Sequence, residues 1–344
     1  MDLRLTDEQV QLVGAFGALY ANESTPARVR EAEPLGFDAA LWSQLTELGV
    51  LRMAVGEAVG GWGASLLDLG LIAEQHGRAV AAAPLIEAQV ATRLLARLGA
   101  ATADDLAASL AGEKLTTVSL TVGRGGRAFM VPAGAVADDV LVRVGDDLVL
   151  VPIGTDKVVP ENSGSLPLAD VTLAGGRVLA SGPAADAAFE AAVDDWLTLT
   201  ANALVGIAAR SLEIGVDYVK ERHAFGQPIG SFQAVAHRLA DSAAARSGAE
   251  LISREAAWAA GEEPARHREL AAMAFAFAAE TAAGASYRSL HFHGGYGFML
   301  EYDIQLYFRR ARAWAAVGMS ADEAYRRVAR TRAASGVAAA GGGA

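Results

Sequence analysis

The alternation of apolar and polar positions divides the chain into a helical first part, a short strand-rich part and a long helical remainder. Near the start, Thr6 followed by Gln9 predicts a helix that opens with a capping box. A second helix is expected to begin near Asp38 and to end at Gly49, where a glycine favours the left-handed conformation of a helix end. These signals predict an N-terminal helical domain over residues 1–112.

A different pattern follows between residues 113 and 182. Short runs rich in β-branched residues alternate with turn signals, and they read TTVSLTV, DVLVRV, LVLVPI and DVTLAG. Gly145, Asp146 and Asp147 separate two of these runs and predict a hairpin. We therefore expect a small middle β domain.

Helical periodicity resumes after residue 182 and continues to about residue 335, which predicts a C-terminal domain resembling a four-helix bundle. Glycine and proline interrupt the periodicity at 226–228, 261–264 and 293–297. The final run, GVAAAGGGA, offers little side chain to bury, so a disordered tail is expected over 336–344. The fold class predicted from the pattern is mainly α with a small β domain.

One helix junction carries candidate chemistry, in the string ERHAFGQPIGSFQAVAHRLAD. A helix is expected to stop before Gly226 and Pro228, and Ser231 is placed to cap a next helix that begins at Phe232. Arg222 is thereby held at a helix end, where its fixed fork of donors suits a phosphate. The simpler interpretation is a solvated cation that interacts favourably with a helix C-terminus.

Composition narrows the function classes. Of the 344 residues, 52% are hydrophobic and the formal net charge is -11, so a basic stripe for nucleic acid is not expected. No apolar run is long enough to span a bilayer, and the polar start MDLRLTDEQ does not resemble a signal peptide. There is no cysteine, and the six histidines lack metal-ligand spacing, so neither disulfides nor a metal site are expected. A cytoplasmic location fits these features.

The junction string closely resembles that of the acyl-CoA dehydrogenase family, and the segments FDAALWSQLTELGVLRMAVGEAVGGWGASLLDL and HFHGGYGFMLEYDIQLYFRRAR are similar to family segments as well. The resemblance covers nearly the whole chain. It implies an N-terminal helical domain, a middle β-barrel domain and a C-terminal helical bundle. It also implies that Arg222, Phe225 and Gln233 help to hold the adenosine diphosphate half of FAD at a subunit interface.

A second segment implied in FAD binding is the glycine-rich connection around Gly294 and Gly295. Glycines allow a close backbone approach to a phosphate, although such a connection is more often only a turn. In the family the equivalent loop contacts the adenosine diphosphate portion of the cofactor. His291 stands where the family usually has a glutamine, so the resemblance implies a weaker cofactor contact there.

The resemblance also shows what this chain lacks. The family reaction removes an α proton from an acyl-CoA thioester with a carboxylate base, while the β hydride passes to the flavin. The two positions where family members place that base are Gly318 and Trp196 in this chain, so no catalytic residue is assigned. Asp194 and Asp195 adjoin one of them, and we interpret them as a solvated face or as acids of a first helical turn. The segment SLTVGRGGRA, over 119–128, replaces the family's flavin-ring surface.

These losses resemble one arrangement within the family, a bacterial α2β2 heterotetramer that acts on steroid side-chain CoA thioesters. In it, one chain carries the base and its homologous partner completes the adenosine site. The hypothesis is that this chain is that partner, with acyl-CoA as substrate and an electron-transfer flavoprotein as acceptor. The alternatives are an active homomeric dehydrogenase that uses Asp194, Asp195 or another acid, and a non-enzymatic scaffold or acyl-CoA-binding protein.

Overall fold

The computed structural model describes residues 3–341, with side chains up to residue 334. Helices precede residue 112, strands lie between 116 and 181, and helices follow, which confirms the predicted fold class. The α-helices are α1 (Asp7–Glu23), α2 (Pro26–Glu31), α3 (Ala39–Glu47), α4 (Val50–Met53), α5 (Leu66–Arg78), α6 (Leu85–Leu98), α7 (Ala103–Leu110), α8 (Gly182–Glu221), α9 (Gln233–Glu262), α10 (Pro264–Phe292), α11 (Ile304–Trp314) and α12 (Ala321–Gly341). The strands are β1 (Thr116–Val118), β2 (Arg127–Val131), β3 (Asp139–Val144), β4 (Asp147–Pro152), β5 (Ala169–Thr172), β6 (Arg177–Ser181), β7 (His223–Ala224) and β8 (Gln227–Pro228). The short 3₁₀ helices are η1 (Glu57–Val59), η2 (Gly99–Thr102), η3 (Ile229–Ser231) and η4 (Gly294–Phe298).

The chain folds into two compact units, and each unit is assembled from separated segments. The first unit takes Met1–Pro26, Gly70–Ala81 and Leu197–Ala344, and the second takes Ala27–Leu69 and Ala82–Trp196. Helix α8 therefore starts in the second unit and ends in the first. The division into domains at residues 112, 182 and 335 stays a prediction from the sequence pattern.

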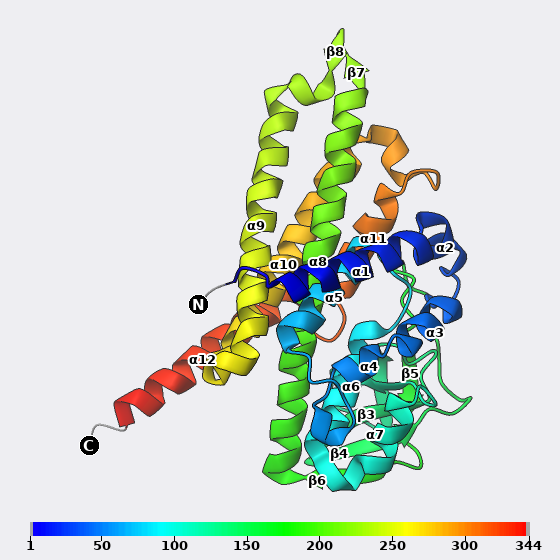
Figure 1. The fold of residues 1–344 in the computed structure, drawn as a ribbon, viewed down its shortest axis with the longest axis vertical. Helices are drawn as coiled ribbons and strands as arrows, with labels where there is room; N and C mark the ends of the chain where they lie inside the picture. Colours follow the sequence, from blue (N-terminus) through cyan, green and yellow to red (C-terminus); the bar gives the residue numbers. More distant parts are fainter. Residues whose placement is uncertain (1–2, 342–344) are drawn as a thin grey trace. The chain divides into compact units, whose positions relative to one another are not determined.

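The first unit is a helical bundle in which α10 contacts α9, α11 and α12. Figure 1 shows α8, α9 and α10 running side by side. Helix α5 crosses α8 at glycines: a Cβ on Gly206 would lie 2.0 Å from the carbonyl oxygen of Glu74, and one on Gly77 would lie 1.9 Å from that of Ala203. Only glycine permits so close an approach of two backbones.

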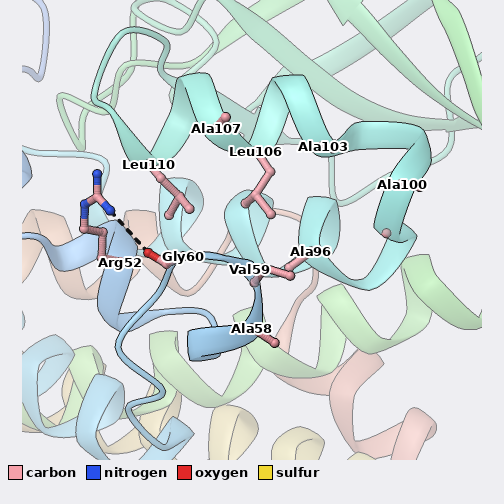
Figure 2. A pocket seen from close by; sticks show the side chains of 11 residues that line it. Arg52, Ala58, Val59, Gly60, Ala96, Ala100, Ala103, Leu106, Ala107 and Leu110 are labelled. Carbon is pink, nitrogen blue, oxygen red and sulfur yellow. Dashed lines mark hydrogen bonds between the residues drawn. The ribbon is translucent and has the colours of Figure 1, made fainter.

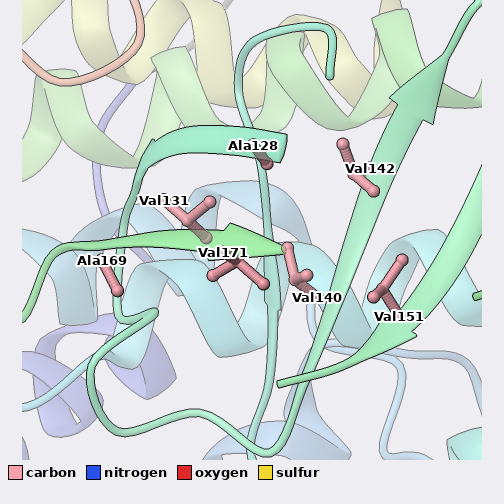
Figure 3. Close-up of a cluster of buried hydrophobic side chains, with 7 residues drawn as sticks. All are labelled: Ala128, Val131, Val140, Val142, Val151, Ala169 and Val171. Carbon is pink, nitrogen blue, oxygen red and sulfur yellow. The ribbon is translucent and has the colours of Figure 1, made fainter. Parts of the chain in front are cut away.

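The second unit holds two small sheets. One has the strand order β1-β3-β4-β6 and the other pairs β2 with β5. Valines and alanines from both sheets meet in one buried core, drawn in Figure 3: Ala128, Val131, Val140, Val142, Val151, Ala169 and Val171. Strands β3 and β4 pair from Val144↔Asp147 onward, so the predicted hairpin at Gly145 is confirmed.

Several local predictions are confirmed by the helix ends. The Thr6 side chain accepts a hydrogen bond from the Gln9 N–H, and the Gln9 side chain accepts one from the Thr6 N–H. Asp38 caps α3, and Gly49 has a φ of 75° between α3 and α4. The Asp38 carboxylate accepts from a backbone N–H at the start of α3, and Gly49 adopts the left-handed conformation that ends it.

The prediction for Ser231 is wrong. Helix α9 begins one residue later than expected, at Gln233, with Phe232 as its N-cap residue. The Ser231 hydroxyl donates to the carbonyl of Pro228 at 2.7 Å instead, because Ser231 belongs to η3. At the other end of the chain, α12 continues to Gly341 where a tail was expected from 336, and residues 342–344 lie outside the described residues.

Helix α8 is the one helix in the described part of the chain with the length and hydropathy of a membrane span. Its most apolar window is 72% buried inside the protein. A mostly buried helix of this kind is also typical of the core of a soluble domain.

Candidate functional site

The helix junction holds Arg222 by its backbone and leaves its side chain exposed. Its N–H donates to the carbonyl of Tyr218 at 2.9 Å, which continues the hydrogen bonding of α8, and its carbonyl accepts from the Ile229 N–H at 2.8 Å. The short hairpin of β7 and β8 lies between those two contacts in the sequence. Within residues 3–334, no carboxylate forms a salt bridge with Arg222, so its guanidinium is available to an anion.

Phe225 lies at the tip of this hairpin in an unusual conformation. Its φ is +55°, and 96% of the residue is exposed. A bulky residue in the left-handed region costs on the order of 1–3 kcal/mol, and such strain is concentrated at functional sites. The ring meets that of Phe232 edge-on at 6.1 Å, and Gln233, the first residue of α9, is also exposed.

The glycine-rich connection forms η4 directly after α10. Gly294 and Gly295 are exposed, and a Cβ built on either would have nothing within 4 Å, so the surface of the loop is open to a ligand. His291 lies exposed on the last turn of α10, with its ring 6.0 Å from that of Tyr287.

Aromatic stacking joins the glycine loop to the end of α8. The rings of Tyr218 and His293 stack with their centroids 3.8 Å apart. Tyr218 precedes Arg222 by one helical turn, and His293 immediately precedes Gly294. The structure therefore brings Arg222 and the glycine loop to the same end of the bundle, through a contact that the sequence did not predict.

His293 is held as a neutral donor in this contact. Its Nδ1 lies 2.7 Å from the carbonyl oxygen of Ser289, so Nδ1 carries the proton and donates it. Burial lowers the pKa of the imidazole, which keeps the ring uncharged near neutrality. The Ser289 hydroxyl in turn donates to the carbonyl of Ser211 at 2.6 Å, fixing α10 against α8.

Large apolar side chains are exposed at this end of the bundle. They lie in and directly after η4 and are Tyr296, Phe298, Met299 and Leu300, with exposures from 44% to 69%. Such a cluster is typical of a surface that another protein or a planar ligand covers.

The two candidate base positions differ in how they exclude a carboxylate. Gly318 has a φ of 72°, a conformation in which a residue with a side chain is strained. Trp196 is 2% exposed, so its indole ring is packed inside the protein at the position where a carboxylate would be needed.

The interpretation of Asp194 and Asp195 as solvated or first-turn acids is wrong. Both lie in the middle of α8, with exposures of 4% and 1%. Asp195 accepts from Arg93 Nε at 2.7 Å and from Arg97 Nη2 at 2.5 Å. Burial alone would raise the pKa of this carboxyl group, but the two arginines outweigh burial and hold the pKa below its usual value.

Glu87 is a half-buried acid that interacts with Trp196, and sequence reasoning missed it. Burial raises the pKa of its carboxyl group, while a backbone N–H and the Trp196 side chain oppose that rise. A signal was available, because Glu87 interrupts the apolar run PLIEAQVA on α6. An acid within such a run is either paired or functional.

Models of one protein family match two large parts of the chain. The model of the acyl-CoA dehydrogenase N-terminal domain matches residues 6–144, and that of the C-terminal domain matches residues 198–334. The chain belongs to the acyl-CoA dehydrogenase family. One relative, the acyl-CoA dehydrogenase IpdE2 of Mycolicibacterium smegmatis, is 30% identical over 89% of this chain and 93% of its own length.

Other family members extend the comparison. The benzylmalonyl-CoA dehydrogenase of Aromatoleum aromaticum is 29% identical over 91% of this chain and 94% of its own length. Among solved structures, the ChsE4–ChsE5 complex from Mycobacterium tuberculosis matches with a TM-score of 0.87 and 26% identity, over 97% of this chain and 99% of that one. A variant of the Tcur3481–Tcur3483 steroid ACAD matches with a TM-score of 0.85 and 28% identity, over 96% and 99%.

FAD is the cofactor of this family, and the residues at the end of the bundle fit its adenosine diphosphate half. Arg222 offers an exposed guanidinium for a phosphate, Gly294 and Gly295 leave space for close contact, and the Phe225 ring is exposed for stacking. The groups required by that half of the cofactor are thus present and accessible.

Proposed function

We propose that this chain is a subunit of a heteromeric, FAD-dependent acyl-CoA dehydrogenase that catalyses α,β-dehydrogenation of an acyl-CoA thioester. In this proposal it completes the adenosine diphosphate site of FAD, and a homologous partner supplies the catalytic base. The observation that carries the proposal is Trp196, a tryptophan that is 2% exposed and stands where a family carboxylate would be.

The open end of the bundle supports the cofactor role of the six proposed site residues. Arg222 would contact the diphosphate, with Phe225 and Gln233 beside the nucleoside, and Gly294 and Gly295 would allow close approach of the backbone. His291 would add a hydrogen bond. When bound, FAD supplies the acceptor for the β hydride. Assembly through the exposed apolar residues of η4 would cover the cofactor and exclude water from it.

The segment that replaces the family's flavin-ring surface also supports this division of roles between the two chains. Over residues 119–128, the Ser119 hydroxyl donates to the carbonyl of Thr121 at 2.9 Å, and Ser119 is fully buried. Arg124 and Arg127 close a tight turn with two backbone hydrogen bonds. Several backbone groups of this segment and the Ser119 hydroxyl are thus hydrogen-bonded within this chain, so the partner chain would provide the ring-side contacts.

The relatives indicate the substrate class and the type of assembly. The Tcur3481–Tcur3483 protein is described as a steroid ACAD, and ChsE4–ChsE5 is described as a complex. By analogy, we propose an α2β2 heterotetramer that acts on a steroid side-chain CoA thioester, transfers electrons to an electron-transfer flavoprotein and resides in the cytoplasm.

A homomeric dehydrogenase with Asp194 or Asp195 as base is less well supported. A general base needs access to the substrate's α carbon and a pKa near the working pH. Asp195 is buried between Arg93 and Arg97, which keep it ionised as a structural ion pair. A scaffold that binds no flavin is also less well supported, because Arg222 and the glycine loop remain accessible.

The test compares this chain alone with the chain co-purified with its homologous partner. We expect the isolated chain neither to reduce flavin with acyl-CoA nor to turn over with an electron acceptor, because no carboxylate is placed to remove the α proton. The pair is expected to hold about one FAD per two chains. Flavin absorbance and steady-state turnover measure these outcomes.

Two variants make the comparison decisive. Replacing the partner's catalytic glutamate by glutamine is expected to abolish turnover while flavin content is retained. Asp194→Asn in this chain is expected to leave turnover per folded complex largely intact. Robust turnover by the isolated chain, lost on substitution of Asp194 or Asp195 in protein that stays folded, would support the homomeric alternative instead.

A further inference from the structure

A groove of about 530 Å³ lies between α6, α7 and η1 in the second unit. Its volume falls within the range of small-molecule sites. The lining is apolar except for one arginine, and it consists of Arg52, Ala58, Val59, Gly60, Ala96, Gly99, Ala100, Ala103, Leu106, Ala107 and Leu110. Figure 2 shows the arginine at one end of the groove, near Leu110, with Ala100 and Ala103 at the other end.

Arg52 is held in place but is not neutralised. Its Nη1 donates to the carbonyl of Gly60 at 3.2 Å, drawn as the dashed line in Figure 2, and its own carbonyl accepts from the Trp62 N–H at 2.8 Å. No carboxylate among residues 3–334 lies within salt-bridge distance of its guanidinium. The remaining guanidinium donors are therefore available to an anion at the end of the groove.

The loop that fixes Arg52 requires its glycines. Gly60 has a φ of +86°, and a Cβ on Gly61 would lie 2.0 Å from the carbonyl oxygen of Val55. Two glycines let the loop turn back against α4 and place the Gly60 carbonyl beside Arg52. A cation fixed before a ligand arrives loses less conformational freedom on binding.

The backbone of the groove favours a hydrocarbon over an extended peptide. Its longest wall comes from α7, whose amides and carbonyls are largely used inside the helix. An extended peptide would find few backbone partners there and would lose the hydrogen bonds it makes with water. A chain of methylene groups has no such cost, and the eight residues of α7 provide a wall about 12 Å long.

We propose that this groove binds an amphipathic carboxylate, of the class of a medium-chain fatty acid. The carboxylate meets the Arg52 guanidinium, and the hydrocarbon lies along Ala107, Leu106 and Ala103 towards Ala100. The site does not depend on the proposed function, since it uses neither the cofactor residues nor the candidate base positions.

The experiment is calorimetric titration of the full chain with decanoate, below the concentration at which decanoate aggregates, and with decanol as the uncharged analogue. Saturable binding of one decanoate per chain is expected. Arg52→Gln should weaken decanoate binding about tenfold, because it removes one charge-assisted contact, and it should leave decanol binding unchanged. Ala107→Phe should abolish the binding of both by filling the groove.

Matched controls sit outside the groove. Arg124→Gln removes another exposed arginine of the same unit, and Ala101→Phe adds a ring beside the groove without lining it. Both should bind decanoate as the unsubstituted chain does. Equal decanoate affinity in Arg52→Gln, or unchanged binding in Ala107→Phe, would overturn the proposal. Displacement of decanoate by decanoyl-CoA in both the unsubstituted chain and Ala107→Phe would also overturn it, by placing the ligand in the acyl-CoA site.

Discussion

Replacing Asp195 by asparagine separates a structural carboxylate from a catalytic one. The Asp195 side chain is 2% exposed and lies within 2.7 Å of Arg93 and 2.5 Å of Arg97. Asparagine keeps the shape and one acceptor but loses the negative charge. Two arginines would then face each other without the group that neutralises them.

The expected cost follows from the exposure of the partners. Breaking a fully buried ion pair by removing one member costs about 3–5 kcal/mol. Here the arginine side chains keep 20% and 31% of their surface in water, so they can recover part of their hydration. The retained amide acceptor offsets a further part. We therefore expect Asp195→Asn to lower the free energy of unfolding by about 2–3 kcal/mol.

The assay is equilibrium urea unfolding, with Asp186→Asn as the matched control on the same helix. Asp186 pairs with Arg143, but 47% of its side chain is exposed, so its loss should cost less than about 1 kcal/mol. The complex formed with Asp195→Asn should retain its specific activity once corrected for the folded fraction. A stability close to that of the control, together with lost dehydrogenation, would refute the structural assignment.

The remaining predictions concern the cofactor contact, a helix crossing and one buried histidine. Arg222→Ala should weaken FAD binding by the complex about ten- to a hundredfold, through loss of a charge-assisted phosphate contact, and unchanged flavin affinity would contradict this. Gly206→Ala should destabilise the fold by about 1–3 kcal/mol or more in thermal unfolding, because the new Cβ would lie 2.0 Å from a backbone oxygen of α5. The control Gly284→Ala should not destabilise the fold, because its Cβ would have nothing nearer than 4.0 Å. Burial lowers the pKa of His76 to about 3 in the folded chain. As the pH falls below about 6.5, the imidazole is therefore protonated in the unfolded chain but not in the folded chain. The free energy of unfolding should decline by up to about 1.4 kcal/mol per pH unit down to pH 3. His76→Phe should flatten that part of the stability profile, and an unchanged slope would show that other groups cause it.

Sequence reasoning succeeded where the decisive interaction was local. The capping box at Thr6 and the glycine turn at Gly49 each depend on residues a few positions apart, so a single segment contains the whole signal. The capping box at Ser320 and Glu323 has the same character. The family motifs, which are also continuous strings, gave the fold class and the cofactor for the same reason.

It failed where the partner lies far away in the chain. The burial of Asp195 depends on arginines about 100 positions earlier, and no local pattern distinguishes such an acid from a solvated one. The contact between Tyr218 and His293 depends on the packing of α8 against α10, so it could not be read from either helix alone. Ser231 failed for a different reason. Its hydroxyl can either accept from a backbone N–H at the start of α9 or donate to a nearby carbonyl, and in the structure it donates to the carbonyl of Pro228.

The assembly of the first unit from three separated segments has a consequence for synthesis on the ribosome. The Tyr307 hydroxyl donates to the carbonyl of Arg78 across 229 positions of sequence. At about 5–20 residues per second, roughly 10 to 50 s pass between the emergence of the two residues. During that time α5 can contact α1, which emerges before it, but it lacks the bundle helices that follow residue 197 until they emerge, so Leu71 and Ile72 lack part of their final packing. A chaperone that shields residues 70–81 until the bundle helices emerge would therefore act on the step of folding most prone to aggregation.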